Sequence, residues 1–455
     1  MKSLVKNIFH PLITTYDGFP GLNRQLVDLE KSQYYSIEVI REIQFERLKK
    51  LIEHAYQNVP FYKKRFDQYN FKPAMLKDTS DLKVIPPLTK TDIKENGELL
   101  IARNIPKREM HRSSSGGTTG VMTWFYRDNR SLVPKEASQL RFEKWTGWDI
   151  GEWMSIIWPA VIDSHPTNWK SKLKNQLAYR KNTLDFAVIN TDAINDHLLL
   201  MKKTKTTMIR AFPIPMVEVA RYVLAHQPDR FQVKGVITTG EPLYESQRNL
   251  IEKTFQCKVY DSYRTREIGA IAQECEEHDG LHINSESVYL EIVADQKDQI
   301  DNKQNGKLLV TDLFNYASPF IRYEIGDVGS FAEKSCSCGR GLPLLQDIGG
   351  RLVDVLYTTD GRKIATITVM PNLIQLLGIT NQVQFEQHSL DRLTIRMSEP
   401  RPGSEIIEKQ CKIAQKLFGE NMQISYEFVD NIPLLPSGKY RLVISHVEDA
   451  EKVEK

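Results

Sequence analysis

The stretch Ser113-Ser114-Ser115-Gly116-Gly117-Thr118-Thr119-Gly120 contains three glycines and five residues with hydroxyl side chains. Glycines let a backbone approach a ligand closely, and hydroxyl and amide groups in such a loop donate hydrogen bonds to phosphate oxygens. The stretch lacks the Lys-Ser or Lys-Thr ending of a P-loop, so it is not a Walker motif. A flexible linker would have the same composition. The rest of the sequence therefore has to distinguish a phosphate-binding loop from a linker.

The composition indicates a globular protein of several domains. The 455 residues include 61 Lys and Arg against 58 Asp and Glu, a net charge of +3, which argues against a protein that coats nucleic acid. No apolar run approaches the about eighteen residues of a membrane span. Five cysteines are few and odd in number, which favours a reducing cytoplasm. We expect a cytoplasmic enzyme without a membrane span; the sequence does not indicate its oligomeric state.

The hydrophobic pattern predicts a mixed α/β organisation that changes along the chain. A helical period covers the first sixty residues, and short apolar or alternating runs predict strands at 233–237, 288–293 and 307–311. The pattern changes again at Gly349-Gly350. Beyond this point it predicts strands at 382–386, 393–397 and 423–428 and a helix at 404–418, which together have the size of a small α+β domain.

All six tryptophans lie between residues 124 and 169. Such a concentration predicts either a dense aromatic core or the wall of a pocket for a planar or apolar substrate. Both interpretations stay open at this point.

Four further motifs follow the Ser/Thr/Gly stretch in a fixed order, and with it they resemble the motifs of the adenylate-forming superfamily, which includes acyl-CoA synthetases, peptide-synthetase adenylation domains and luciferases. They are Tyr263-Arg264-Thr265-Arg266-Glu267, Arg322-Tyr323-Glu324-Ile325-Gly326-Asp327, Gly350-Arg351-Leu352-Val353-Asp354 and Pro436-Ser437-Gly438-Lys439. Within the superfamily, the chain is most similar to the phenylacetate-CoA ligase branch and its CapK-type proteins. The segments that carry this similarity are Ala55–Tyr62, Cys275 with Gly280–Ile283, and Cys336–Arg340.

The resemblance implies an α/β fold in two domains. Residues 1–350 would form an AMP-binding adenylation domain of layered β-sheets with flanking helices, and residues 351–455 a small α+β lid domain that carries the catalytic lysine. It implies an ATP-dependent, AMP-forming ligase that activates a small carboxylic acid as an acyl-adenylate. An aromatic acid is one candidate for this substrate. The acyl group would pass to CoA, to the thiol of a carrier protein or to an amine. The CapK-type resemblance implies capsule polysaccharide synthesis as one biological role.

The resemblance also assigns roles to individual residues. Ser113 to Gly120 would hold the phosphates of ATP, and Lys439 would bring a positive charge to the reacting carboxylate. Glu267 would bind Mg²⁺ and Asp327 the ribose hydroxyls. The remaining residues expected at the nucleotide are Gly240, Glu241, Pro242, Asp261, Ser262, Tyr263 and Arg351. Tyr263 would stack on the adenine, whereas Arg351 has a structural salt bridge at the domain boundary as its alternative role.

The sequence departs from the superfamily pattern at several of these motifs. Val121-Met122 follows the loop where Lys-Pro is usual, and Val353 replaces the aspartate of the hinge. Arg264 and Arg266 stand where glycine and threonine are usual. Arg266 is therefore a candidate catalytic residue that meets a phosphate or carboxylate, or else it pairs with Glu267. These departures keep a second hypothesis open, a nucleotide-binding protein without turnover, while the charge balance disfavours a zinc-stabilised nucleic-acid binder.

Three cysteines and a histidine suggest a zinc site. Cys275, Cys336 and Cys338 with His282 would supply three thiolates and an imidazole, which suffice for a closed tetrahedral site. His278 is the alternative fourth ligand, because it stands in a Cys-x-x-His spacing with Cys275. Three buried thiols beside ordinary histidines are the competing interpretation.

Overall fold

The computed structural model describes residues 1–114, 124–158, 168–185, 191–226, 232–294, 306–351, 355–361, 363–365, 383–398, 401–429, 432 and 443–447. Three of the predicted features lie outside these residues: the stretch from Ser115 to Gly120, the hinge residue Val353 and the lysine loop with Lys439. Arg351 is described in its backbone only.

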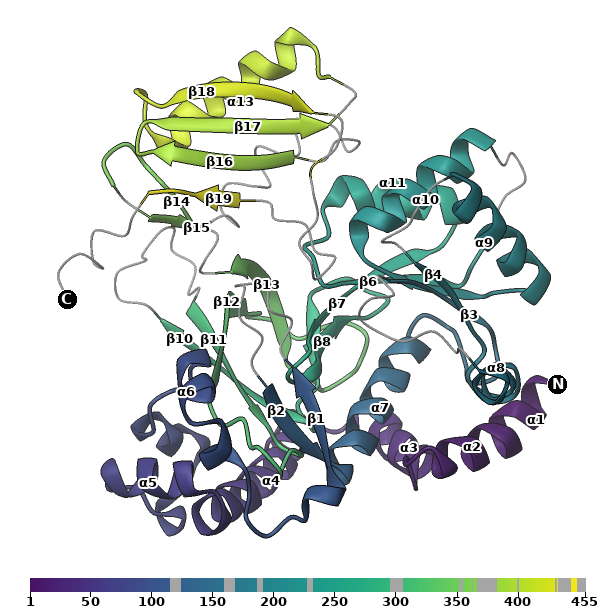
Figure 1. The fold of residues 1–455 in the computed structure, drawn as a ribbon, viewed down its shortest axis with the longest axis vertical. Coiled ribbons are helices and arrows are strands. Elements are labelled where there is room, and N and C mark those ends of the chain that lie inside the picture. The colour runs from purple at the N-terminus through teal and green to yellow at the C-terminus, as the bar shows by residue number, and fades with distance from the viewer. Residues whose placement is uncertain are drawn as a thin grey trace.

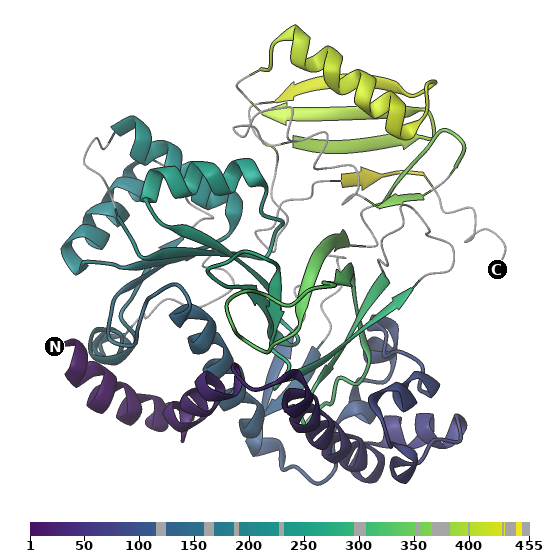
Figure 2. The same cartoon turned by 180° about the vertical axis from the view of Figure 1, so that it is seen from behind.

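The chain begins with helices, as its apolar period predicts. They are α1 (Lys2–Leu4), the π-helical turn Val5–Phe9, α2 (His10–Tyr16), α3 (Leu22–Ser32), α4 (Ile37–Asn58), α5 (Pro60–Gln68) and α6 (Lys90–Glu95). Pro60 starts α5 at a position where its missing N–H costs nothing. Thr89 caps α6 by accepting a hydrogen bond from the Asp92 N–H. Figure 2 shows α1 to α4 running along the bottom of the molecule.

An eleven-stranded sheet forms the centre of the molecule, in the order β10-β11-β12-β13-β9-β8-β7-β6-β5-β3-β4. Its parallel half consists of β3 (Met154–Trp158), β4 (Lys181–Asp185), β5 (Met208–Ala211), β6 (Gly235–Thr239) and β7 (Lys258–Thr265). Its antiparallel half consists of β8 (Gly269–Glu274), β9 (Leu281–Ile283), β10 (Val288–Ala294), β11 (Gly306–Asp312), β12 (Tyr323–Phe331) and β13 (Leu344–Arg351). The pairing changes from parallel to antiparallel at β7.

Each half of the sheet packs against its own helices. The other helices of this part are α7 (Asn129–Lys144), α8 (Trp169–Lys174), α9 (Thr191–Thr204), α10 (Pro213–His226) and α11 (Glu245–Phe255). Leu198 of α9, Val219 of α10 and Ile251 of α11 are buried in one core with β3 and β5 to β7. Helices α4 and α5 contribute Leu48 and Tyr62 to a second core under the antiparallel strands.

The two strands that flank the Ser/Thr/Gly stretch pair with each other. They are β1 (Met110–Ser114) and β2 (Trp124–Asp128), antiparallel, with Ser114 opposite Trp124. The sequence pattern did not predict this pair. It brings the two ends of the stretch together beside the antiparallel half of the central sheet (Figure 1).

The C-terminal part has its own sheet and its own core. The strands β16 (Val383–Ser389), β17 (Arg392–Ser398), β18 (Gln423–Val429) and β19 (Val443–Ser445) form one sheet, and β14 (Val355–Tyr357) pairs with β15 (Lys363–Ala365). Helix α13 (Ser404–Phe418) buries Phe418 against Phe385 and Ile395. This unit lies at the top of both ribbon views (Figures 1 and 2).

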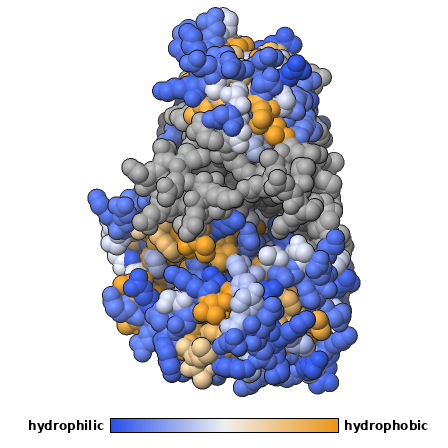
Figure 3. Space-filling view, turned by 90° about the vertical axis from the view of Figure 1, so that its left-hand side faces the viewer, coloured by the Kyte–Doolittle hydropathy of each residue, from blue (hydrophilic) through white to orange (hydrophobic). Residues whose placement is uncertain are grey.

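The α/β prediction is confirmed, and so are the predicted strands from residue 233 onward and the helix at 404–418. In the central sheet, the strands β3, β4, β5, β7, β8, β12 and β13 were not predicted. In the part of the chain that the structure describes, every helix is too short or too polar to cross a membrane. The face in Figure 3 is mainly hydrophilic over both parts, and apolar side chains gather at only a few places on it.

Candidate active site

Two motifs that are far apart in the sequence meet where β7 ends. The Tyr263 hydroxyl, near the end of β7, donates a hydrogen bond of 2.6 Å to Asp327 Oδ2 on β12. Asp327 pairs with Arg351 across β12 and β13. Both Tyr263 and Asp327 are half-buried. Three of the predicted motifs therefore converge on one region of the sheet.

The turn between β7 and β8 carries Arg266 and Glu267. Two basic residues hold its backbone: Arg127 Nη2 donates to the carbonyl oxygens of Arg266 and Glu267, and Lys135 Nζ donates to that of Glu267 at 3.3 Å. Lys135 is also 3.0 Å from Asp312 Oδ2. Burial lowers the pKa of Lys135 to about 8, and Asp312 opposes that shift.

Arg127 and Lys135 contact only the backbone carbonyl oxygens of the turn, so they leave the side chains of Arg266 and Glu267 accessible. Arg266 is exposed and Glu267 is half-buried. Within the described residues neither side chain is part of an ion pair, so the predicted pairing of Arg266 with Glu267 is not formed. Glu267 is thus available as a ligand for a cation.

Arg264, the other departure in this motif, points into the protein. Its Nε donates to Ser262 Oγ at 2.8 Å, and its Nη1 donates to Gln139 Oε1 of α7 at 3.0 Å. Burial, assisted by the positive charge of Arg210, lowers the pKa of Arg264 to about 10. Arg264 therefore fastens β7 to α7.

The end of β6 approaches the same region through Gly240, Glu241 and Pro242. Gly240 has φ = +87°, and a Cβ at this position would lie 2.3 Å from the Phe212 ring, so glycine is required here. The Thr239 hydroxyl donates to the Ser262 carbonyl oxygen at 2.6 Å, which fixes the end of β6 beside β7. Glu241 is half-buried and Pro242 is exposed.

Aromatic rings lie next to Gly240 at the ends of the neighbouring parallel strands. Trp158 ends β3 and Phe212 follows β5, and their ring centroids are 4.4 Å apart. The six tryptophans do not share one role, because Trp124 and Trp169 are exposed and Trp153 is half-buried. Trp145 and Trp148 are buried in the core, whereas Trp158 stands at the carboxyl edge of the sheet, where ligands of open α/β sheets bind.

Asp261 lies two residues before Tyr263 and has an unusual electrostatic environment. Its backbone N–H donates to Glu274 Oε2 at 2.8 Å, and its Oδ1 accepts from the Ser262 N–H at 2.9 Å. Burial and the neighbouring Glu274 carboxylate raise the pKa of Asp261 to about 7, although Arg248 opposes the shift. Asp261 therefore titrates near neutral pH.

Ser113 and Ser114 are the described members of the predicted phosphate loop. Both are half-buried at the end of β1, where they face Phe125 and Trp124 across the strand pair. The neighbouring Arg112 guanidinium lies 3.8 Å from the centroid of the Trp124 ring. A loop that leaves β1 here starts beside the antiparallel half of the sheet.

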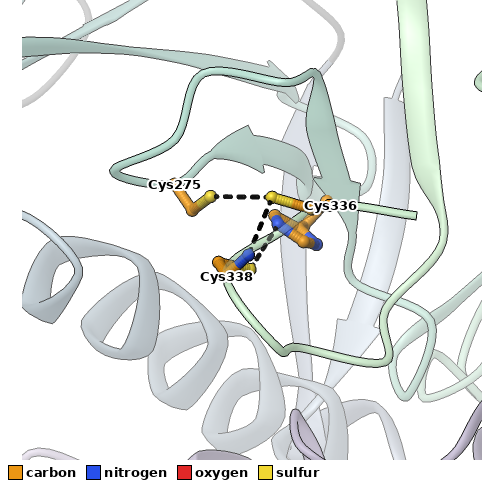
Figure 4. Close-up of side chains that lie close together, drawn as sticks. Cys275, Cys336 and Cys338 are labelled. Carbon is orange, nitrogen blue, oxygen red and sulfur yellow. Dashed lines mark hydrogen bonds between the residues drawn. The ribbon is translucent and has the colours of Figure 1, made fainter. Parts of the chain in front are cut away.

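The predicted cysteine and histidine ligands also come together. Cys275 Sγ lies 3.5 Å from Cys336 Sγ, and Cys338 Sγ lies 3.3 Å from His282 Nε2. Figure 4 shows the three sulfur atoms pointing toward one another. His278 lies elsewhere, because its Nδ1 is 3.2 Å from both Glu274 and Arg248.

Sequence reasoning missed Arg127 and Lys135, although both contact the predicted Glu267 motif. A weak signal existed, because Arg127 and Lys135 follow the Ser/Thr/Gly stretch within fifteen residues. No local pattern, however, connects them with a turn more than a hundred residues later in the chain.

Comparisons with known proteins agree with this arrangement. The sequence profile of the CapK C-terminal domain matches residues 356–446. Protein CapK of Staphylococcus aureus is 23% identical over 92% of this chain and 93% of its own length. The phenylacetate-coenzyme A ligase of Thermus thermophilus is 24% identical over 88% of this chain and 94% of its own length. The chain is thus related along most of its length to phenylacetate-CoA ligases and CapK.

Solved structures show the same fold. A 2-hydroxyisobutyryl-CoA ligase, in the postadenylation state with an acyl-AMP, superimposes with a TM-score of 0.71 at 19% identity, over 90% of both chains. The fold is therefore that of the adenylate-forming CoA ligases. The resemblance predicted from five sequence motifs, to the phenylacetate-CoA ligase and CapK-like branch of that superfamily, is confirmed.

Proposed function

We propose that this chain is an ATP-dependent, AMP-forming acid–CoA ligase. The observation that supports it most strongly is the meeting of Tyr263, Asp327 and the Glu267 turn at one edge of the sheet, in a fold shared with CoA ligases. The curated phenylacetate-CoA ligases that match most of the chain support the same activity.

The proposed reaction has two steps. In the first, a carboxylate oxygen of the acid attacks the α-phosphorus of ATP, and the bond to pyrophosphate breaks. In the second, the CoA sulfur attacks the acyl carbon, and AMP leaves as the acyl–oxygen bond breaks. Charge builds on phosphate oxygens in the first step, so positioned donors and cations carry most of the catalysis.

We assign the nucleotide contacts to the residues that converge at β7. The Asp327 carboxylate would accept hydrogen bonds from the ribose hydroxyls, and the Tyr263 ring would face the adenine. Gly240 to Pro242 would present backbone to the same base, with Asp261, Ser262 and Arg351 close to it. The loop from Ser113 to Gly120 would donate to the phosphates.

Glu267 is the proposed ligand for Mg²⁺, whose chemistry is to neutralise charge on phosphate oxygens. The fit rests on its half-buried carboxylate on a turn that Arg127 and Lys135 hold by the backbone. The exposed Arg266 guanidinium would meet a phosphate or the acid carboxylate from the same turn. Lys439 would bring a further positive charge from the C-terminal domain.

We propose a small carboxylic acid, aromatic or apolar next to the carboxyl group, as the substrate. The half-buried Trp158 ring at the end of β3 supports this proposal, because it offers planar apolar surface at this edge and packs on the buried Phe212 beside Gly240. Gly240 keeps Phe212 in place, since any side chain there would displace the ring.

CoA is the proposed acceptor, and the thiol of a carrier protein or an amine are the alternatives to be tested against it. We propose residues 351–455 as a lid domain that carries Lys439, in keeping with the separate core of the C-terminal part. A role in capsule polysaccharide synthesis in the cytoplasm would follow the similarity to CapK alone.

Product analysis tests the proposal. The purified chain is incubated with MgATP, a panel of acids and one acceptor at a time: CoA, hydroxylamine or a carrier protein. The proposal predicts AMP and an acyl-CoA for one class of acids. Formation of ADP, or AMP binding without any product from a broad panel, would contradict it and favour the nucleotide-binding protein without turnover.

A further inference from the structure

We propose that Cys275, His282, Cys336 and Cys338 bind one structural zinc ion, independently of the ligase activity proposed above. Their four ligand atoms lie within 4.8 Å of one another. Cys275 directly follows β8 and His282 lies on β9, whereas Cys336 and Cys338 lie in the connection between β12 and β13. A shared ion would therefore join two hairpins that are about sixty residues apart in the chain.

The separations fit a tetrahedral thiolate and imidazole site. Zn–S bonds of about 2.3 Å at tetrahedral angles place neighbouring sulfurs about 3.8 Å apart, and a sulfur and an imidazole nitrogen slightly closer. The structure has 3.5 Å between Cys275 Sγ and Cys336 Sγ and 3.3 Å between Cys338 Sγ and His282 Nε2. Small outward movements of the side chains would give the full coordination distances.

The imidazole of His282 is oriented for coordination by the group on its other side. His282 Nδ1 lies 3.2 Å from the Leu342 carbonyl oxygen, which can only accept a hydrogen bond. Nδ1 therefore carries the proton, and the lone pair of Nε2 faces the sulfurs. A carbonyl oxygen on the outer nitrogen is the usual partner of a histidine that binds zinc.

Backbone N–H groups surround the sulfur atoms. Cys275 Sγ accepts from the Glu277 N–H at 3.4 Å, Cys336 Sγ from the Cys338 N–H at 3.5 Å, and Cys338 Sγ from the Arg340 N–H at 3.4 Å. Such donors stabilise negative charge on sulfur, which is the form that binds a metal. Three thiols in an ordinary core would not need a donor each.

The arrangement is closed, which makes the site structural. Cys275 and His282 are fully buried, and four protein ligands complete a tetrahedron without an open position for substrate or water. The cluster also contacts α7: Trp145 packs edge-to-face on His282 at 5.5 Å, and the Arg340 guanidinium lies 4.5 Å from the Trp145 ring centroid. The ion would thus fasten both hairpins to the end of α7.

Metal analysis of the purified full chain tests the inference. After dialysis we expect about one zinc per chain, released when a mercurial reagent blocks the thiols, and tetrahedral thiolate absorption after cobalt substitution. Cys336→Ser should lose the zinc and unfold at lower temperature. Cys257→Ser is the matched control, since Cys257 is a half-buried free thiol outside the cluster, and it should keep both.

Two results would overturn the inference. One is a wild-type chain that, folded in excess zinc, retains no metal and whose three cluster thiols react equally fast with and without zinc. The other is a native mass two daltons lower than expected with no metal, which would show a disulfide instead. Both experiments use wild-type protein, so they stand even if Cys336→Ser fails to fold. A chain that holds zinc without ligase activity would support this inference and contradict the proposed function alone.

Discussion

The Tyr263 hydroxyl donates a hydrogen bond of 2.6 Å to the Asp327 carboxylate, and this contact joins β7 of the parallel half of the sheet to β12 of the antiparallel half. β9, β8 and β13 lie between the two strands in the sheet. The contact therefore bridges three intervening strands and links the two halves of the sheet. A nucleotide bound at this edge would touch both halves.

Substitutions of Tyr263 and Asp327 should separate the proposed ribose contact of Asp327 from the hydrogen bond that Tyr263 donates to it. Asp327→Ala removes the proposed ribose contact, and loss of hydrogen bonds to a charged group, about 2–3 kcal/mol, predicts a fall of about 30- to 160-fold in kcat/KM for ATP. Tyr263→Phe loses one hydrogen bond and should cost only about fivefold. Steady-state kinetics with varied ATP measure both.

Asp391→Ala is the control for Asp327→Ala. Asp391 also accepts a hydroxyl hydrogen bond, from Ser389 at 2.7 Å, but it lies in the turn between β16 and β17. It should leave kcat/KM for ATP unchanged. An Asp327→Ala enzyme with the wild-type KM and kcat would refute the assigned contact.

Gly240→Ala should damage the site by displacing Phe212. The new Cβ would meet the ring at 2.3 Å, in a backbone conformation that alanine adopts with strain. We expect a fall of at least about tenfold in turnover together with a lower melting temperature. Gly361→Ala has nearly the same φ, +84°, and nothing within 4 Å of its Cβ, so it measures the strain alone. Equal effects of the two substitutions would show that the Phe212 contact does not matter.

The two unusual arginines should behave differently. Arg264 is half-buried with a partner on α7, so Arg264→Met should leave Gln139 Oε1 without that hydrogen bond and lower the stability by about 1–3 kcal/mol. Arg266 is exposed, so Arg266→Ala should leave the melting temperature within about a degree of wild type. Its turnover should fall, as the proposed contact to phosphate or carboxylate requires. Thermal unfolding and steady-state kinetics of both variants test these two roles. Full activity of Arg266→Ala would exclude Arg266 from the proposed active site.

Asp261 should make stability depend on pH. Its pKa is about 7 in the folded protein and near 4 in the unfolded chain, so between these values the folded state binds a proton that the unfolded state lacks. Stability should therefore fall as pH rises from about 4 to 7, with the full loss above pH 7. Asp261→Asn lacks this titration, so the melting temperature of the variant relative to wild type should rise from pH 5 to pH 8. A difference that stays constant over this range would exclude the raised pKa.

Local patterns predicted elements with a regular repeat, but not β7, β12 and β13, which carry Tyr263, Asp327 and Arg351. The alternation at 288–293 and the amphipathic period at 404–418 determine β10 and α13, because each buries one face of a local repeat. The short strands β3 and β5, in contrast, carry few residues and lie between helices, so their sequence alone gives no clear period. Their strand form depends on pairing with distant neighbours.

The sequence predicted the site residues that belong to a motif. It did not predict side-chain orientations and contacts that depend on tertiary packing. The sequence indicated that Cys275 and Cys336 belong together, and that Tyr263 and Asp327 serve one ligand. It did not show that Arg264 turns inward toward α7 while Arg266 turns outward. Both arginines lie near the end of β7, and only the packing around each one determines which way its side chain points. Nor did it connect Arg127 with the Glu267 turn.

Acid-dependent exchange between ATP and radiolabelled pyrophosphate tests the proposed ligase activity without any acceptor, because it reports adenylate formation alone. Purified protein with Mg²⁺ and a panel of aryl, hydroxy, amino and short fatty acids should show exchange with one class of acids. Asp327→Ala and Lys439→Ala should each reduce that exchange by at least about tenfold. No exchange with any acid, from protein that still binds AMP by calorimetry, would contradict the account and show a nucleotide-binding protein without turnover.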